Sequence, residues 1–371
     1  MDKESSNTAG APLSAWSWQM TSWWVVIISV LLGIWGCLAI YSTQIAAQGD
    51  WGFLGRQVAF LVIGVPLMIA CWNVPFKVYE KLMTPLTALA LFGVIAVLFW
   101  GRTVNGMSGW FEPFPGVRFQ PAELAKPIFV LAMVCMWRRI APVSRWWALI
   151  AVTVITLAFA IPVAKEPDLG TTVIFLGTMV IFLFLTGMKL WRFLCGAGVI
   201  GVVVGLLCWW QWDKVAARFA GLFYAASDPL GGGWQVRQFQ LAISRGGWTG
   251  SKLGNTVWVE NYMPLAHNDS IFAAMAETLG MLGSAILLVM IAVLIATLIS
   301  LSERAAEGYR KLFIATAAFM LALQAGLHIS VNATLLPPTG LTLPFISYGG
   351  SSLLASMILV GMALSAAREK N

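Results

Sequence analysis

The chain of 371 residues is 59% hydrophobic and only 11% charged, whereas soluble globular proteins carry about 25% charged residues. These values exclude a soluble protein and predict an integral membrane protein, because a helix crosses the bilayer with roughly 20 mostly apolar residues. The net charge of +7 therefore does not indicate nucleic-acid binding, since basic residues in a membrane protein mark cytoplasmic loops and contacts with anionic headgroups.

Ten apolar runs predict an all-α protein with about ten transmembrane helices in one domain, residues 23–371, after a polar cytoplasmic tail, residues 1–22. Residues 211–270, between the seventh and eighth runs, are predicted to form a large extracytoplasmic loop. The predicted spans are 23–44, 54–73, 83–100, 121–137, 146–164, 170–187, 191–210, 271–300, 312–333 and 349–367. Most basic residues outside the long loop then fall between spans on the N-terminal side, which predicts that both termini are cytoplasmic.

The segment VRFQPAELAK, residues 117–126, precedes and opens the fourth predicted span. Pro121 suits the first turn of a helix, and Glu123 suits its positive end. Glu123 and Lys126 are three residues apart and share a helix face, so one interpretation is an interfacial ion pair. The alternative adds Arg118, so that one carboxylate and two cations bind an anionic headgroup at the outer mouth of the span.

The segment KEPDLGTT, residues 165–172, places Asp168 directly before the sixth predicted span. Asp168 is therefore a candidate N-cap for that helix. Lys165 and Glu166 beside it concentrate charge at the membrane boundary, which also makes the segment a candidate binding site.

Within the long outer loop, residues 228–233 are predicted to form a turn or hinge. Val236, Phe239 and Ile243 then recur with helical spacing, with Arg245 on the opposite face. This pattern predicts a short amphipathic helix that either lies on the membrane surface or packs against the spans.

The segment PLAHNDSIFAAMAETLG, residues 264–280, places His267 and Asp269 just before the eighth span and Glu277 inside it. Asp269 either caps the helix or serves chemistry. An ionisable residue within a span is costly and indicates function, so Glu277 either acts in the site or pairs with a basic residue on a neighbouring helix. His267 and Asp269 can converge in a loop. A zinc site is not expected, because the outer side offers one histidine and no cysteine.

The uncharged segment of residues 332–354 contains three prolines and the pair Gly349–Gly350, which interrupt a helix. Non-helical backbone at membrane depth is tolerated only where it is buried in protein or lines a cavity. We therefore expect a tightly packed outer loop that forms the floor of a cavity, and we expect His328 on the preceding span to be a hydrogen-bonded residue between helices.

Five segments carry a family resemblance: VRFQPAELAK, EPDLGTT, SDPLGGGW, LGNTVWVENYMPLAHND and GLTLPFISYGGSS. In this order they resemble the shape, elongation, division and sporulation (SEDS) family of peptidoglycan polymerases, and the division branch (FtsW) more than the elongation branch (RodA). The resemblance implies polymerisation of lipid II on the outer face of the bacterial cytoplasmic (inner) membrane. It also implies a class B penicillin-binding protein and other divisome or elongasome proteins as partners.

The resemblance further implies roles for single residues. Asp269 matches the family's essential loop aspartate, acting as a general base or as the ligand of a divalent cation such as Mg²⁺ or Mn²⁺. The predicted substrate-binding residues are Arg118, Glu123, Lys126, Asp168, His267 and Glu277. No cofactor other than such a cation is expected.

The sequence departs from the family pattern close to these positions. Leu265, Asn268 and Thr278 stand where the family usually has glutamate, threonine and glutamate, Ser270 replaces phenylalanine, and Glu166 replaces glutamine. Because the aspartate itself is kept, an active enzyme is expected. Two other functions stay open: a lipid-II flippase or other transporter, and a catalytically silent scaffold for a penicillin-binding protein.

Overall fold

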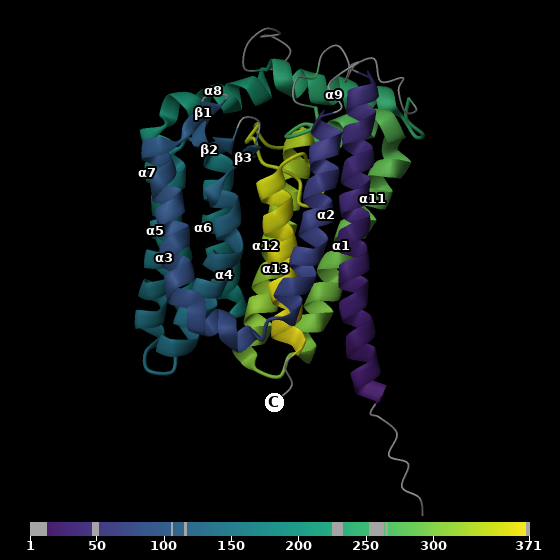
Figure 1. Cartoon of the computed structure of the whole chain (residues 1–371). Helices are drawn as coiled ribbons and strands as arrows, with labels where there is room; N and C mark the ends of the chain where they lie inside the picture. Colours follow the sequence, from purple (N-terminus) through teal and green to yellow (C-terminus); the bar gives the residue numbers. More distant parts are fainter. Residues whose placement is uncertain are drawn as a thin grey trace, which may run out of the picture.

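The computed structural model describes residues 13–46, 52–104, 107–114, 117–224, 233–251, 263 and 266–368 (Figure 1). Three sequence features discussed above therefore lie outside the described residues: the turn of residues 228–233 except Gly233, most of the segment that begins at Leu253, and Leu265.

In the described part of the chain, ten long helices run side by side as a bundle, and two shorter helices lie across one end of it (Figure 1). The long helices are α1 Leu13–Ala46, α2 Gly52–Asn73, α3 Phe76–Trp100, α4 Pro121–Ile140, α5 Arg145–Lys165, α6 Leu169–Leu185, α7 Leu190–Trp210, α11 Ile271–Arg304, α12 Gly308–Asn332 and α13 Gly350–Arg368. The shorter helices are α8 Trp212–Phe223 and α9 Trp234–Gly246. Each predicted span corresponds to one long helix, so the predicted helical membrane architecture is confirmed.

Eight of the long helices in the described part of the chain are long and apolar enough to cross a membrane. The other two, α4 and α6, occupy the remaining predicted spans. Helix α4 carries Glu123, Lys126, Arg138 and Arg139 within its 20 residues, and α6 has only 17 residues. The charges of α4 do not disqualify it as a span, because its Glu123 and Lys126 are buried against other helices.

Two helix starts differ most from the prediction. Helix α1 begins at Leu13, inside the predicted tail, and α3 begins at Phe76 rather than at residue 83. The earlier start of α3 has a packing reason: the Phe76 side chain is fully buried, with its ring centroid 5.0 Å from that of Phe313 on α12.

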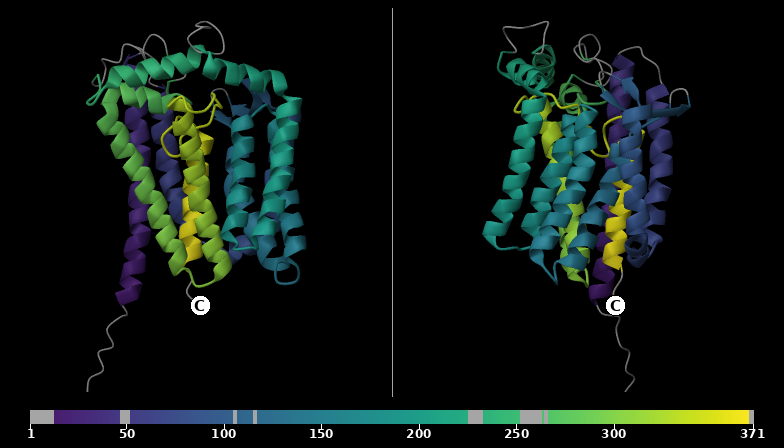
Figure 2. Two further views of the ribbon diagram at one scale, coloured as in Figure 1. Left: turned by 180° about the vertical axis from the view of Figure 1, so that it is seen from behind. Right: turned by 90° about the vertical axis from the view of Figure 1, so that its left-hand side faces the viewer.

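The start of α1 and the end of α13 lie at the same end of the bundle, and α8, α9 and the strands lie at the other (Figures 1 and 2). This arrangement agrees with the prediction that the chain begins and ends on one side and carries its long loop on the other. The assignment of the first side to the cytoplasm stays a prediction.

Helix α13 forms the centre of the bundle, with 89% of its most apolar stretch buried, whereas α7 lies at the edge with 11% buried. Helix α13 contacts α2, α4 and α12, and α7 contacts α5, α6 and α8. The centre is rich in small residues: Ser352, Ala355 and Gly361 of α13 let neighbouring helices approach closely.

Between α3 and α4 the chain forms a small antiparallel sheet that the sequence analysis did not predict. Its strands are β1 Arg102–Val104, β2 Met107–Phe114 and β3 Val117–Phe119, in the order β1-β2-β3. Glu112 of β2 accepts a hydrogen bond from Arg102 at 3.0 Å and lies 3.6 Å from Arg118. The sheet thus brings Arg118 to the outer end of α4.

Helix α9 packs against α11. Of the two interpretations of the amphipathic segment, packing against the spans is therefore correct. Val236 and Phe239 are buried, and α11 is interrupted at Gly280, whose φ is +65°. The backbone after α9 hydrogen-bonds into this interruption: the Met281 and Leu282 N–H groups donate to the Gly247 and Trp248 carbonyls at 2.9 and 3.2 Å. Helix α9 is therefore fixed to the span that follows Asp269.

Candidate functional site

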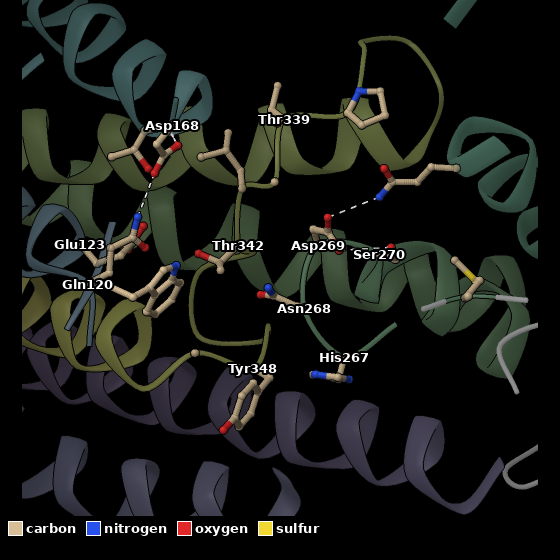
Figure 3. Close-up of a pocket in the computed structure, with 18 of the residues that line it drawn as sticks. Gln120, Glu123, Asp168, His267, Asn268, Asp269, Ser270, Thr339, Thr342 and Tyr348 are labelled. Atoms are coloured by element: carbon tan, nitrogen blue, oxygen red, sulfur yellow. Dashed lines mark hydrogen bonds between the residues drawn. The ribbon is translucent and has the colours of Figure 1, made fainter. Parts of the chain in front are cut away.

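A cavity of about 900 Å³ opens at the end of the bundle that carries α8 and α9. Its walls come from α2, α4, α6, α8 and α9, from strands β2 and β3, and from residues 267–270 and 338–350 (Figure 3). The loop after α12 supplies Pro338, Thr339, Gly340, Leu341 and Thr342 to this lining. The predicted role of that loop as a cavity floor is confirmed.

Asp269 lines the cavity just before α11 begins at Ile271. Its carboxylate accepts hydrogen bonds from Gln235 Nε2 and from the Ser270 hydroxyl, each at 3.4 Å. Burial raises the pKa of Asp269, while the hydrogen bonds from Gln235 and Ser270 lower it. The alternative role as helix cap is wrong, because Ser270 holds the N-cap position and no side chain caps the helix.

The backbone of Asp269 is fixed by Asn332 at the end of α12. Asn332 Nδ2 donates to the Asp269 carbonyl at 2.9 Å, and Asn332 Oδ1 accepts from the Ala273 N–H at 3.0 Å. The fully buried His328 lies one turn earlier, and its Nδ1 is 2.7 Å from the Leu341 carbonyl. His328 is hydrogen-bonded as expected, but its partner Leu341 lies in the loop between α12 and α13 rather than on a neighbouring helix.

The loop that precedes α13 holds the other side of the same segment. Ser347 donates to the Asn268 carbonyl at 2.7 Å and accepts from the Leu343 N–H at 2.8 Å. The Tyr348 N–H donates to the His267 carbonyl at 2.8 Å. The segment of residues 266–270 is therefore held by hydrogen bonds from both ends of the loop, and this preorganises Asp269.

His267 also lines the cavity, as its spacing from Asp269 suggested. Its ring stacks on Phe53 with centroids 4.4 Å apart and meets Tyr348 edge-on at 5.4 Å. Burial lowers the pKa of His267, so the ring is uncharged at neutral pH. The side chain offers the site an aromatic wall rather than a cation.

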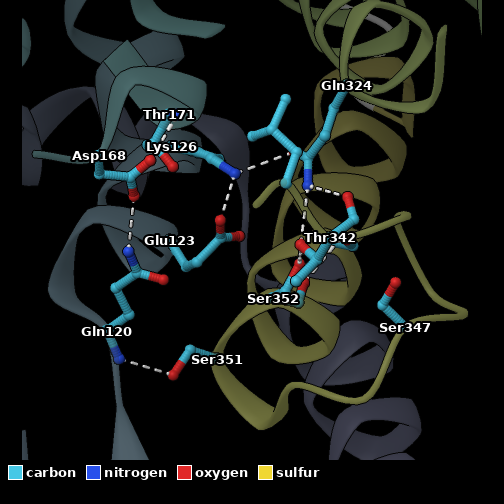
Figure 4. A network of polar contacts seen from close by, with 12 residues as sticks. Gln120, Glu123, Lys126, Asp168, Thr171, Gln324, Thr342, Ser347, Ser351 and Ser352 are labelled. Atoms are coloured by element: carbon cyan, nitrogen blue, oxygen red, sulfur yellow. Dashed lines mark hydrogen bonds and ion pairs between the residues drawn. The ribbon is translucent and has the colours of Figure 1, made fainter. Parts of the chain in front are cut away.

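Asp168 lies on the opposite side of the cavity from Asp269 (Figure 3). It caps α6 as predicted, accepting from the Thr171 N–H at 2.9 Å, and it accepts from Gln120 Nε2 at 2.9 Å (Figure 4). Burial raises the pKa of Asp168, and the Thr171 hydrogen bonds oppose this. The neighbouring Glu166 is fully buried, and neither of its carboxylate oxygens has a hydrogen-bond partner among the described residues.

Glu123 and Lys126 form the predicted ion pair, at 2.6 Å. Lys126 also donates to Gln324 Oε1 at 2.9 Å, and Gln324 Nε2 donates to the Thr342 carbonyl at 3.0 Å (Figure 4). Glu123 lines the cavity, but Lys126 is not among the lining residues. Lys126 therefore binds Glu123 and Gln324 of α12 rather than a headgroup.

Three arginines line the cavity: Arg118 of β3, Arg56 of α2 and Arg218 of α8. The Arg118 side chain is 50% exposed. The sequence analysis selected Arg118 but missed Arg56 and Arg218, because nothing in their local sequence separates them from other basic residues of the outer segments.

Glu277 lies outside the cavity lining, although it was predicted to bind substrate. Its side chain is fully buried and its Oε1 lies 3.8 Å from Arg245 Nε on α9. This pairing corresponds to the alternative of a basic partner on a neighbouring helix, and it links α9 to α11.

Among the described residues, no group of three or more His, Cys, Asp and Glu side chains converges as a metal site. A single carboxylate suits Mg²⁺, which binds through one or two carboxylates together with waters and substrate phosphates. Within the segment of residues 266–270, Asp269 supplies such a carboxylate to the cavity lining.

The sequence analysis missed the glutamines of the site: Gln120, Gln235 and Gln238. A usable signal was present for two of them. Gln235 and Gln238 lie three residues apart on the helix whose Val236 and Phe239 were recognised as residues of the apolar face. Two amides beside that face indicated that a polar surface lies against this helix.

Comparison with known proteins identifies the family. Residues 21–371 match the FtsW/RodA/SpoVE family, described as cell cycle proteins. The chain is 34% identical to the probable peptidoglycan glycosyltransferase FtsW of Thioalkalivibrio sp. (strain K90mix), over 86% of this chain and 81% of that protein. It is also 34% identical to that of Alcanivorax borkumensis, over 93% and 92% of the two chains.

Solved structures give the same result. One chain of a peptidoglycan synthase complex, described for its coordination of polymerization and crosslinking, matches with a TM-score of 0.76 and 28% identity, over 93% of this chain and 97% of that one. The rod shape determining protein RodA of Thermus thermophilus matches with a TM-score of 0.68 and 26% identity, over 93% and 96% of the two chains. The chain therefore belongs to the FtsW/RodA/SpoVE family of cell cycle proteins, the SEDS family, and is FtsW-like.

Proposed function

We propose that this chain polymerises lipid II into glycan strands, with Asp269 at the reacting centre. The protein is a multi-pass protein of the bacterial inner membrane, and its curated relatives are named as peptidoglycan glycosyltransferases. The observation that carries the proposal is the position of Asp269: a partly buried carboxylate on one side of a 900 Å³ cavity that arginines also line.

In the proposed reaction the acceptor sugar's 4-hydroxyl oxygen attacks the anomeric carbon of the donor. The new glycosidic bond forms as the bond between that carbon and the diphosphate oxygen breaks, and undecaprenyl diphosphate leaves with the bonding electrons. Asp269 takes the hydroxyl proton as general base. Because burial raises its pKa, its carboxylate is a stronger base than an exposed aspartate.

The cationic side chains of the cavity suit the leaving group. Arg56, Arg118 and Arg218 line the cavity, and guanidinium groups bind phosphate oxygens with paired hydrogen bonds. Such contacts stabilise the charge that develops on the diphosphate as the bond breaks. In the alternative role, Asp269 would instead hold a divalent cation, which would neutralise the same charge.

A partner that crosslinks the strands belongs to the same proposal. One structural relative is a chain of a peptidoglycan synthase complex that combines polymerization with crosslinking. We propose a class B penicillin-binding protein in this place, together with other divisome or elongasome proteins.

The test is polymerisation of labelled lipid II by the purified chain, with and without its cognate penicillin-binding protein. Wild type is compared with Asp269→Asn, which keeps the size of the side chain but cannot act as a base. Parallel reactions contain a chelator, followed by added Mg²⁺ or Mn²⁺. We expect glycan strands from wild type and none from Asp269→Asn. The melting temperature of Asp269→Asn should equal that of wild type.

Other outcomes reject the proposal in distinct ways. Equal strand formation by both proteins removes Asp269 from the chemistry. No strands from wild type, combined with lipid-II scrambling by both proteins in vesicles, identifies a transporter. No strands and no scrambling identify a scaffold.

A further inference from the structure

The first turns of α5 and α7 meet at the end of the bundle that carries the chain termini, opposite the cavity (Figure 1). Trp146 of α5 and Trp191 of α7 make an edge-to-face contact, with ring centroids 5.1 Å apart. The guanidinium carbon of Arg192 lies 5.2 Å from the Trp191 ring centroid and 6.0 Å from that of Trp146. The Arg192 guanidinium therefore lies beside a pair of tryptophans that joins the two helices.

The tryptophan pair belongs to the surface that faces the bilayer. Trp146 and Trp191 are 41% and 48% exposed, and their neighbours Leu190 and Leu194 on α7 are 70% and 57% exposed. Lipid covers such an apolar surface in a multi-pass membrane protein, and tryptophan is enriched where the acyl chains meet the headgroups. The Arg192 guanidinium therefore lies at the level of the lipid headgroups.

Positive charge at this end of α5 and α7 has no acidic counterpart. Arg145 is the first residue of α5, and Lys189 is the N-cap residue of α7. The sequence contains no Asp or Glu from residue 124 to 165 or from 169 to 212, and these stretches include both helices. Within the part of the chain that the structure describes, no ion pair includes Arg145, Lys189 or Arg192.

A cationic site at the level of the headgroups suits a phosphate. The edge of a guanidinium binds phosphate oxygens with paired N–H groups, while its flat faces stack on aromatic rings. The tryptophan contacts can therefore orient Arg192 without using the donors that bind the phosphate. Basic pockets between transmembrane helices bind the headgroups of anionic phospholipids in this way. A zwitterionic lipid such as phosphatidylethanolamine is disfavoured, because its ammonium group is repelled by the cations.

We propose that Arg192, together with Trp146 and Trp191, binds the phosphate of an anionic phospholipid in the leaflet at this end of the bundle. Arg145 and Lys189 add positive charge around it. The bound headgroup joins α5 to α7, the helix at the edge of the bundle that leads directly into α8. This site is separate from the cavity, and the inference does not depend on the proposed glycosyltransferase function.

The experiment measures lipid binding to the purified full chain in detergent by native mass spectrometry. The probes are phosphatidylglycerol, cardiolipin and phosphatidylethanolamine. Arg192→Met removes the guanidinium, and Arg192→Lys keeps the charge but removes the planar fork. The matched control is Lys81→Met, which removes one charge from an exposed position on α3 at the same end of the bundle.

We expect Arg192→Met to raise the Kd for the two anionic lipids about tenfold, as for the loss of one hydrogen bond to a charged group. Arg192→Lys should raise it by a smaller factor, and Lys81→Met should bind as wild type does. Phosphatidylethanolamine should bind weakly and equally to all four proteins. Equal melting temperatures in lipid-free detergent show that the variants are folded. Arg145→Gln, at an exposed position beside the tryptophan pair, should also raise the Kd for the anionic lipids, and it decides the question if Arg192→Met does not fold.

Three results would overturn the inference. Equal weakening by Arg192→Met and Lys81→Met would show that binding follows the overall charge of this end rather than a built site. Unchanged binding of the anionic lipids by folded Arg192→Met, or by Arg145→Gln if the first variant does not fold, would remove the site. Phosphatidylethanolamine bound by wild type as tightly as phosphatidylglycerol would exclude selection of an anionic headgroup.

Discussion

Lys126 Nζ lies 2.6 Å from Glu123 Oε1, and the two side chains are only 4% and 6% exposed. Lys126 also donates to Gln324 on α12. The pair therefore joins α4 to the helix whose far end fixes Asp269 through Asn332. The ion pair thus links α4 on the Asp168 side of the cavity to α12, which holds Asp269 on the other side.

We predict that Lys126→Met destabilises the protein by about 3–5 kcal/mol, because it leaves the Glu123 carboxylate buried without its partner. The double variant Glu123→Gln/Lys126→Met recovers most of this loss, because an uncharged pair carries no such penalty. Thermal unfolding in detergent measures both. The control is Lys214→Met, at an exposed position on α8. A double variant no more stable than the single one would contradict the prediction.

Gln235→Met is predicted to move the acidic limb of the pH–rate profile to higher pH. Asp269 must be ionised to act as a base, so activity rises as pH increases through its pKa. Burial raises that pKa and the hydrogen bond from Gln235 lowers it, so removal of the amide raises it further. The measurement is kcat/KM for lipid II against pH, and Gln240→Met on the same helix is the control. An unshifted limb would show that Gln235 does not act on the charge of Asp269.

The spans could be predicted because the bilayer requires runs of about 20 apolar residues whatever their neighbours are. The sheet of residues 102–119 could not, because short strands depend on pairing partners rather than on local pattern. Helix α8 was missed for a different reason: its 12 residues have an amphipathic helical pattern, but they were grouped with the surrounding polar loop.

The site was only partly predictable, for a related reason. Asp168 and Asp269 stand in local motifs that carry their roles, and the structure places both in the cavity lining. The partners of Lys126 and Asp269 come from residues 198 and 34 positions away in sequence, which no local pattern reveals. Glu277 was misassigned because burial in a span looks the same whether its partner is a substrate or, as here, Arg245.

Glu166→Gln is predicted to remove a pH dependence of stability. Burial, with a contribution from Asp168, raises the pKa of Glu166 to about 9, against an ordinary value of 4.5. Between these values the folded protein keeps a proton that the unfolded chain releases, so this group stabilises the fold below the lower pKa and its contribution is lost as pH rises through the upper one. Glutamine has no proton to lose.

The measurement is the melting temperature from about pH 5 to 9. We expect the stability of Glu166→Gln relative to wild type to increase steadily over this range. Glu303→Gln, at an exposed position near the end of α11, should show a constant difference. A constant difference for Glu166→Gln would mean that the Glu166 carboxyl is ionised in the folded protein.

Gly246→Ala is predicted to separate α9 from α11 and to reduce activity. A methyl group at Gly246 would lie 1.9 Å from the Ala276 carbonyl oxygen, a backbone atom that cannot move without displacing α11. Relief of such overpacking typically costs about 1–3 kcal/mol and a backbone shift. The shift would also move Gln235, at the other end of α9, away from Asp269.

The control is Gly198→Ala on α7, where an added methyl group meets no atom within 4 Å. We expect Gly246→Ala to lower both the melting temperature and the rate of strand formation, and Gly198→Ala to lower neither. A loss of stability without loss of activity would show that α9 can leave α11 while Asp269 stays aligned, since Asn332 and Ser347 hold its segment independently of α9. The fixed position of α9 would then not be required for catalysis.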